Sequence, residues 1–309
     1  MQNTLRGKDI LSIDDLSPAE MEMVVERALR LKEKPPFAPL RDMVVACCFF
    51  EPSTRTRLSF ETAVLRLGGH VIGFADSSNT SMKKGETLQD TARIISNYAD
   101  AIVMRHPVNG SVDVVAQYAS VPVINAGDGT NQHPSQTLLD LVTIKETQGR
   151  LDGIKIAMVG DLRYGRTVHS LTQALSHFGA TFYYVSPQSL SMPQDLLDKL
   201  DRDGLSYEQT TDLESALPEC DVVYMTRLQR ERIDPDELKR LPASLRLDAQ
   251  MLSRARVKKN MRILHPLPRV DEVAADVDDT PYAYYFEQAN NGLYAREAML
   301  SLALSDETV

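Results

Sequence analysis

Short apolar runs of strand length alternate along the chain with segments whose apolar residues recur at helical spacing. Residues 43–50 form a continuous apolar run, which predicts a strand covered on both faces. In the segment that follows, Phe60, Val64 and Leu67 share one helical face, and Gly68 stands where a left-handed residue would end the helix. This region therefore predicts a buried strand that leads directly into a helix.

The same alternation continues in two separate runs. The first run predicts further strands at 70–74, 101–104 and 122–125, and helices at 87–98 and 112–118. The second run predicts strands at 154–159, 181–185, 222–225 and 262–264, and helices at 167–178 and 195–200. Two such runs predict an α/β protein with two doubly wound domains, each a mainly parallel sheet flanked by helices and joined by bridging helices.

Length supports the same division, because 309 residues correspond to two domains at roughly 150 residues each. Residues 1–134 are predicted to form the first domain, completed by a C-terminal helix at 288–309. Residues 150–285 form the second domain. A helix at 135–149 bridges them, because Pro134 suits its first turn and Gly149 stands past its end.

Charge and composition then exclude several classes of function. The net charge of −9 argues against a nucleic-acid partner, because a phosphate backbone requires a broad basic face. No apolar run approaches the roughly 18 residues that a membrane span needs, and the N-terminus lacks an apolar secretory core. Cys47, Cys48 and Cys220 form neither a disulfide framework nor a zinc pattern. We therefore expect buried thiols in a cytoplasmic protein.

The most informative chemistry follows the first buried strand. Ser53, Thr54, Arg55 and Thr56 are four consecutive donor residues at a predicted strand-helix junction. Ligands of such sheets collect at the carboxyl ends of the strands, and the first N–H groups of a helix favour an anion. The guanidinium fork of Arg55 also matches a phosphate. A solvated helix cap is the alternative, but four donors in a row favour an anion site.

Two further groups of the first domain fall at similar positions. Arg105 follows the strand at 101–104 and so lies at the same predicted sheet edge. His133 begins the bridging helix, where the helix dipole disfavours an imidazolium and leaves a neutral ring able to donate one hydrogen bond. A surface ion pair is the alternative for Arg105, but its position at this edge favours a functional role. A lone histidine is more often structural, so the residues alone leave the role of His133 open.

The second domain also has basic residues after its strands. Arg166 opens a helix, whereas Arg227 and Gln229 follow the strand at 222–225. From the residues alone, each arginine is either a carboxylate ligand or a solvated loop residue. The glycines at 160 and 165 are five apart and do not form a dinucleotide-binding fingerprint, so a dehydrogenase is disfavoured.

In this order the motifs resemble those of the aspartate carbamoyltransferase family, in the form whose catalytic chains pair with regulatory chains. The resemblance extends from about residue 7 to residue 304. It depends on four segments that are highly specific together: 49–57, 103–107, 125–134 and 265–269. The first segment alone is typical of the wider carbamoyltransferase family.

The resemblance implies a role for each motif. The residues implied to bind carbamoyl phosphate are Ser53, Thr54, Arg55, Thr56, Arg105, His133, Gln136, Leu267 and Pro268. The residues implied to bind aspartate are Lys84, Arg166, Arg227 and Gln229. Among these, the catalytic residues are Arg55, Thr56, Lys84, Arg105 and His133. Ser81 and Lys84 would reach a neighbouring subunit's site, and Glu51 and Arg232 would pair across the domains on closure.

The implied reaction transfers the carbamoyl group of carbamoyl phosphate to the amino group of L-aspartate, an early step of de novo pyrimidine (UMP) biosynthesis. Carbamoyl phosphate is an activated mixed anhydride, so no metal, cofactor or covalent nucleophile is expected. The resemblance also implies a homotrimer with shared active sites, and it allows regulatory chains in a dodecamer.

Two alternatives remain at this point. Ornithine carbamoyltransferase shares the phosphate motif, but it differs in the loop at 265–268 and in the segment that binds the amino acid. A non-catalytic scaffold related to the transferases would be expected to have lost some phosphate-binding residues. This chain retains Ser53, Arg55, Arg105 and His133.

Overall fold

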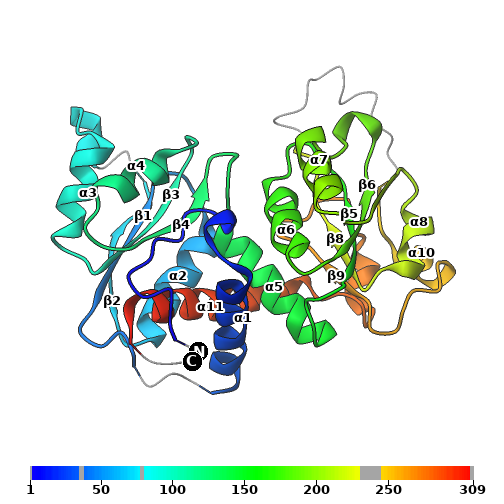
Figure 1. The fold of residues 1–309 in the computed structure, drawn as a ribbon, viewed down its shortest axis with the longest axis horizontal. Coiled ribbons are helices and arrows are strands. Elements are labelled where there is room, and N and C mark those ends of the chain that lie inside the picture. Colours follow the sequence, from blue (N-terminus) through cyan, green and yellow to red (C-terminus); the bar gives the residue numbers. More distant parts are fainter. Residues whose placement is uncertain (1, 35–37, 77–79, 230–244, 307–309) are drawn as a thin grey trace. The chain divides into compact units, whose positions relative to one another are not determined.

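The computed structural model describes residues 2–34, 38–76, 80–229 and 245–306. It divides into two compact units, and Figure 1 labels most of their helices and strands. Unit 1 comprises Met1–Val142 with Asn290–Val309, and unit 2 comprises Thr143–Ala289.

Unit 1 contains a four-stranded parallel sheet in the order β2-β1-β3-β4. Its strands are β1 (Val44–Phe49), β2 (His70–Phe74), β3 (Ala101–His106) and β4 (Val123–Asp128). Its other elements are η1 (Ile13–Asp15), α1 (Pro18–Glu33), α2 (Thr54–Arg66), η3 (Ser81–Lys84), α3 (Leu88–Ser96) and α4 (Ser111–Tyr118). The register places Phe49 of β1 beside Arg105 of β3, so the carboxyl ends of the two central strands are adjacent.

The apolar runs of the sequence explain this sheet. Five of the six residues of β1 are buried, as expected for a strand covered on both faces. Ala46, Cys48, Ile102 and Met104 pack in one core cluster with residues of α3 and α4. β2, by contrast, lies at the sheet edge and is largely exposed.

Unit 2 contains a five-stranded parallel sheet in the order β7-β6-β5-β8-β9. Its strands are β5 (Lys155–Val159), β6 (Thr181–Val185), β7 (Tyr207–Thr210), β8 (Val222–Met225) and β9 (Arg262–Leu264). Its helices are α6 (Arg166–Ser176), η4 (Gln188–Leu190), α7 (Gln194–Arg202), α8 (Leu213–Ala216), η5 (Leu217–Glu219), α10 (Ala249–Arg254) and η6 (Ala275–Asp279). The sequence pattern did not predict β7, because this edge strand is polar and largely exposed.

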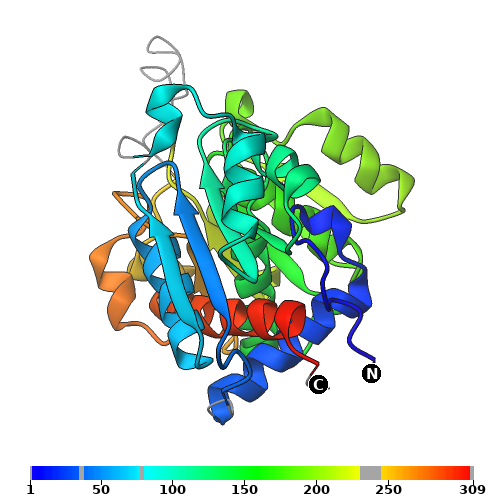
Figure 2. The same cartoon turned by 90° about the vertical axis from the view of Figure 1, so that its left-hand side faces the viewer.

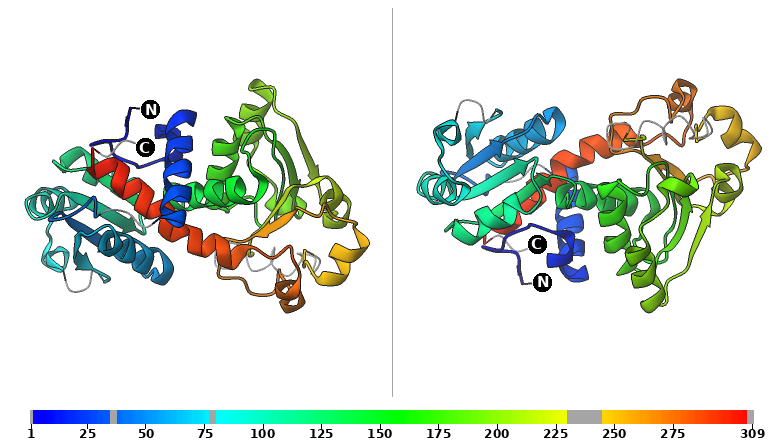
Figure 3. Two further views of the ribbon diagram at one scale, coloured as in Figure 1. Left: turned by 90° about the horizontal axis from the view of Figure 1, so that it is seen from below. Right: turned by 90° about the horizontal axis from the view of Figure 1, so that it is seen from above.

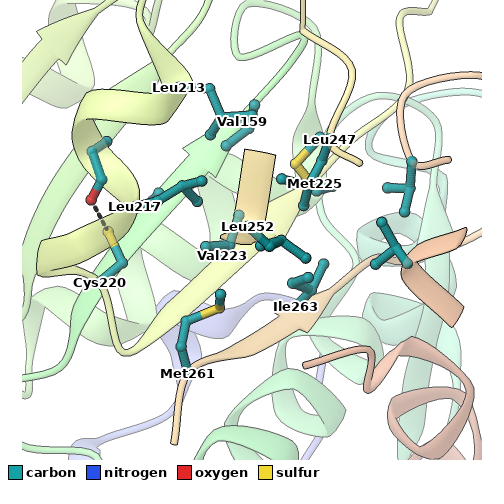
Figure 4. Close-up of a cluster of buried hydrophobic side chains, with 14 of the residues drawn as sticks. Val159, Leu213, Leu217, Cys220, Val223, Met225, Leu247, Leu252, Met261 and Ile263 are labelled. Atoms are coloured by element: carbon teal, nitrogen blue, oxygen red, sulfur yellow. Dashed lines mark hydrogen bonds between the residues drawn. The ribbon is translucent and has the colours of Figure 1, made fainter. Parts of the chain in front are cut away.

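The core of unit 2 lies on β8 and β9 (Figure 4). Val223, Met225 and Ile263 are fully buried there and pack against Leu217 and Leu252. At the rim of this cluster, the thiol of Cys220 donates to the Ala216 carbonyl at 3.2 Å. Cys47, Cys48 and Cys220 are all buried and unpaired as disulfides, which confirms the prediction of buried thiols.

Two helices contribute residues to both units, namely α5 (Pro134–Gln148) and α11 (Tyr285–Leu304). The C-terminal part of α11 packs beside α1 within unit 1, as Figures 2 and 3 show. Lys32 donates to Asn291 at 2.8 Å, and Arg27 donates to Ser301 at 3.3 Å. The predicted α/β class with two parallel sheets is confirmed. In the part of the chain that the structure describes, no helix has both the length and the hydropathy of a membrane span.

Candidate active site

The N-terminus of α2 lies at the carboxyl end of β1 and presents backbone donors. Ser53 is the N-cap residue, and in the described structure its side chain makes no capping hydrogen bond. The first turn also carries no acidic residue. Thr54 and Arg55 are exposed, whereas Thr56 is buried. The hydroxyls and the first N–H groups are therefore available to an anion, which the positive end of the helix favours.

Arg105 brings a second positive charge to this end of the sheet. Its Nε donates to Glu51 Oε1 at 2.7 Å, and its Nη1 contacts the carbonyl of Ala126 at 3.4 Å. At position 127 a Cβ would lie 3.0 Å from Nη1, so Gly127 leaves space for the guanidinium. Burial and the charge of Arg105 lower the pKa of Arg55, which indicates two close and mutually repelling cations. A bound anion would relieve this repulsion.

His133 joins the same group from the start of α5. Its Nε2 lies 3.5 Å from Arg105 Nη1, and its Nδ1 lies 3.3 Å from Ser135 Oγ. Because a guanidinium has donors only, its approach to the ring nitrogen disfavours a second positive charge on His133. Gln136 follows Ser135 in α5, and its side-chain Nε2 donates to Asp140 Oδ1 at 3.0 Å.

Ser81 and Lys84 lie on the short helical turn η3 and are exposed. Gly85 ends this turn with a φ of +93°, which favours glycine. The family resemblance predicts that both residues act in the site of a neighbouring subunit.

In unit 2 the residues predicted to bind the substrate aspartate lie after β5 and β8, which are neighbours in the sheet. The Asp161 carboxylate accepts from the backbone N–H groups of Tyr164 at 2.9 Å and Gln229 at 3.3 Å, and it therefore joins the two loops. Burial raises the pKa of Asp161. Arg166 opens α6 from the first loop, and Arg227 lies half-buried in the second.

A close approach of the backbone fixes the distance between these loops. A Cβ at position 160 would lie 2.4 Å from the Thr226 carbonyl oxygen, and Gly160 has a φ of +118°. Only glycine satisfies both conditions. Arg166 and Arg227 are therefore presented from the same edge of the sheet.

The loop after β9 is held by a buried histidine. The backbone N–H of His265 donates to the side chain of Gln288 at 2.7 Å. The Nδ1 atom of the His265 ring accepts the Leu267 N–H at 2.8 Å. The ring proton must therefore lie on Nε2, which is 2.6 Å from Glu272 Oε1. Burial opposes ionisation of Glu272, but hydrogen bonds from His265 and the backbone outweigh it and lower its pKa. Leu267 has a φ of +56° and precedes a cis proline, Pro268.

Sequence reasoning did not identify Glu272, Asp161 or Asp140, because no motif marks a carboxylate that supports another site residue. Arg232 lies outside the described residues. Within those residues, no group of three or more His, Cys, Asp and Glu side chains could hold a metal.

Comparison with known proteins identifies the family. The pattern described as "Aspartate/ornithine carbamoyltransferase, carbamoyl-P binding domain" matches residues 8–146, and its "Asp/Orn binding domain" matches residues 152–303. The chain therefore belongs to the aspartate/ornithine carbamoyltransferase family.

Relatives within the family indicate which of the two amino acids is the acceptor. The aspartate carbamoyltransferase catalytic subunit of Chromobacterium violaceum is 60% identical over 97% of this chain and 98% of its own length. That of Vibrio vulnificus is 57% identical over 99% of both chains.

Solved structures agree. The catalytic subunit of M. jannaschii aspartate transcarbamoylase has a TM-score of 0.88 and 46% identity, and covers 95% of this chain and 97% of its own. The Trypanosoma cruzi enzyme in complex with carbamoyl phosphate and aspartate has a TM-score of 0.91 and 38% identity, with 98% of both chains covered. These findings confirm the prediction of an enzyme that carbamoylates aspartate.

Proposed function

We propose that unit 1 binds carbamoyl phosphate, that unit 2 binds aspartate, and that the residues predicted from the sequence perform the transfer. The observation that carries this proposal is the uncapped N-terminus of α2 beside the Arg55 and Arg105 guanidiniums. Ser53, Thr54 and Arg55 hold the phosphate together with Arg105. Phosphate suits this site because it accepts from backbone N–H, hydroxyl and guanidinium donors at once.

The reacting carbonyl lies next to the phosphate. Thr56, Arg105 and His133 donate to the carbamoyl oxygen, where negative charge develops in the tetrahedral intermediate. Removal of one such donor commonly costs about 3–4 kcal/mol of activation free energy. Gln136 and the Leu267 carbonyl, in the loop with Pro268, accept from the carbamoyl amide.

The acceptor is held by cations. Arg166, Arg227 and Lys84 bind the two carboxylates of aspartate, and Gln229 adds an amide. These cations offset the repulsion between two anionic substrates. The neutral amino group of aspartate then attacks the carbamoyl carbon, the C–O bond to phosphate breaks, and the departing phosphate accepts the amine proton. Holding both substrates in line supplies several kcal/mol of the barrier reduction. The product enters the early part of pyrimidine biosynthesis.

We propose a homotrimer in which Ser81 and Lys84 complete the site of a neighbouring subunit. Unit 1 exposes large apolar side chains on and near α2, β2 and α3, which supports association with other copies. These are Leu65 (62% exposed), Ile72 (40%), Ile94 (47%) and Tyr98 (65%). Regulatory chains that assemble such trimers into a dodecamer, and a cytoplasmic location, are part of the same proposal.

The phosphate site is tested by comparing Arg55→Ala with Arg57→Ala. Both arginines lie in the first turns of α2, but Arg57 pairs with Glu61 at 2.7 Å. We expect Arg55→Ala to lower turnover by orders of magnitude and Arg57→Ala to change it by less than about threefold, since a partly exposed ion pair on one helix contributes little. Wild-type turnover in Arg55→Ala would refute the assignment.

The shared site is tested by mixing two inactive variants, Arg55→Ala and Lys84→Ala, under conditions that exchange subunits. If sites are shared, mixed trimers contain some sites with neither substitution, and activity returns. No recovery in mixtures whose mass establishes mixed trimers would exclude a shared site.

A further inference from the structure

Gln136 is held in one orientation by a buried carboxylate one helical turn further along α5. Its Nε2 donates to Asp140 Oδ1 at 3.0 Å, and Asp140 is fully buried. An ionised carboxylate only accepts hydrogen bonds, so the amide nitrogen must be the atom that faces it. The amide oxygen of Gln136 is then the atom left for a ligand.

Arg296 of α11 brings a buried guanidinium whose charge interacts with that of Asp140. Its side chain is buried, and the ring of Phe60 lies 5.1 Å from its Cζ. Burial lowers the pKa of Arg296 to about 10, while the charge of Asp140 opposes this shift and Arg105 adds to it. Arg296 is therefore still protonated at neutral pH.

The chain makes room for this guanidinium one turn earlier on the same helix. At position 292 a Cβ would lie 2.4 Å from Arg296 Nη1 and 3.1 Å from Leu139. Gly292 is helical and needs no positive φ, so the reason for a glycine here is space. One buried group is thus formed by Gly292, Arg296 and Asp140. It is connected to the candidate site through the hydrogen bond between Asp140 and Gln136.

We infer that Asp140, supported by Arg296, is a positioning residue that fixes Gln136 with its amide oxygen toward the substrate and thereby selects a carbamoyl group over an acyl group. This rests on the proposed contact between Gln136 and the carbamoyl amide. A carbamoyl NH₂ donates to that oxygen. The methyl group of acetyl phosphate cannot, and it leaves a polar atom unpaired.

The test compares three anions on the whole enzyme: carbamoyl phosphate, acetyl phosphate and inorganic phosphate. Calorimetric titration gives the affinity for each. Asp140→Asn replaces a group that only accepts with an amide that both donates and accepts, so the Gln136 amide is no longer held in one orientation and can rotate to present its nitrogen. We expect carbamoyl phosphate to bind about tenfold more weakly, because a donor then faces a donor. Affinity for inorganic phosphate should change by less than about twofold, since phosphate does not reach Gln136.

A charge-conserving swap separates positioning from a general loss of structure. In the double variant Gln136→Glu/Asp140→Asn, the carboxylate moves one turn along α5 and the total charge is unchanged. Its first oxygen accepts from the new amide and its second oxygen faces the substrate. We expect the ratio of carbamoyl phosphate to acetyl phosphate affinity to return to within about threefold of wild type. This variant also decides the matter if Asp140→Asn alone does not fold.

The outcomes distinguish this inference from the proposed function. If Gln136→Ala leaves carbamoyl phosphate affinity unchanged, the proposed contact itself is wrong. If Gln136→Ala weakens binding but Asp140→Asn does not change the affinity ratio, only the positioning role is wrong. A swap variant that folds but has lost selectivity, or an equal loss for all three anions in Asp140→Asn, would also overturn it.

Discussion

Replacing Glu272 with glutamine is expected to lower the free energy of unfolding by about 2 kcal/mol without changing the fold. The Glu272 carboxylate accepts the His265 ring N–H at 2.6 Å and the backbone N–H groups of Val270 at 3.2 Å and Asp271 at 3.1 Å. Glutamine keeps one acceptor oxygen, so its NH₂ must face one set of donors. If the oxygen stays with His265 at the Oε1 position, the Val270 N–H keeps its 3.2 Å contact to that oxygen, whereas the Asp271 hydrogen bond to the other oxygen is lost. A hydrogen bond to a charged acceptor contributes about 1.5–3 kcal/mol.

The effect should depend on pH in a defined direction. The pKa of Glu272 is lower in the folded chain than its ordinary value of 4.5. Its contribution to stability is therefore fully present above about pH 4.5 and is lost as the pH falls through the folded-state pKa. The difference in unfolding free energy between wild type and Glu272→Gln should be full at pH 7 and shrink below pH 4.5.

Urea unfolding followed by circular dichroism, at equal subunit concentration, measures this difference. Glu287→Gln is a matched control, because Glu287 belongs to the same unit and is exposed. We expect the control to lie within about 0.5 kcal/mol of wild type. A Glu272→Gln chain as stable as wild type at pH 7, or a difference that stays constant to pH 4, would refute the reasoning.

Three further results are expected. Gly160→Ala should weaken aspartate binding more than carbamoyl phosphate binding, because the new Cβ meets the Thr226 carbonyl at 2.4 Å; steady-state kinetics with each substrate varied would check this, and an unchanged KM for aspartate would contradict it. Arg227→Ala should raise the KM for aspartate by at least about tenfold, as for loss of a charged partner; a change confined to carbamoyl phosphate would show that the predicted role is wrong. Burial raises the pKa of Cys48 and Cys220 to about 12. Both thiols should therefore react with a thiol reagent at pH 8 only after the protein is unfolded in urea. Rapid reaction of the native enzyme would exclude their burial.

Buried central elements were predictable from the sequence because their apolar runs leave few alternatives. The strand predicted at 43–50 is β1 (Val44–Phe49), and that at 154–159 is β5 (Lys155–Val159). The polar edge strand β7 (Tyr207–Thr210) was not predicted, because its stability depends on pairing with β6 rather than on a buried face.

The candidate site was predictable where its residues lie at or just after strand ends in recognisable motifs. Ser53 follows β1, and Arg105 lies near the end of β3. Their supports were not predictable, because Asp140 and Arg296 belong to different helices and meet only in the folded chain. A carboxylate that orients another side chain leaves no periodicity or spacing in the sequence.

The Asp161 contacts have a consequence for how acceptor preference can diverge in this family. Asp161 binds the backbone N–H groups of Tyr164 and Gln229, so this link between the two loops runs through backbone atoms and not through the side chains proposed to bind aspartate. Residues 166, 227 and 229 can therefore change while the loop framework persists. A single ancestral scaffold could in this way exchange an anionic acceptor for a cationic one through side-chain replacement alone, with its backbone conserved.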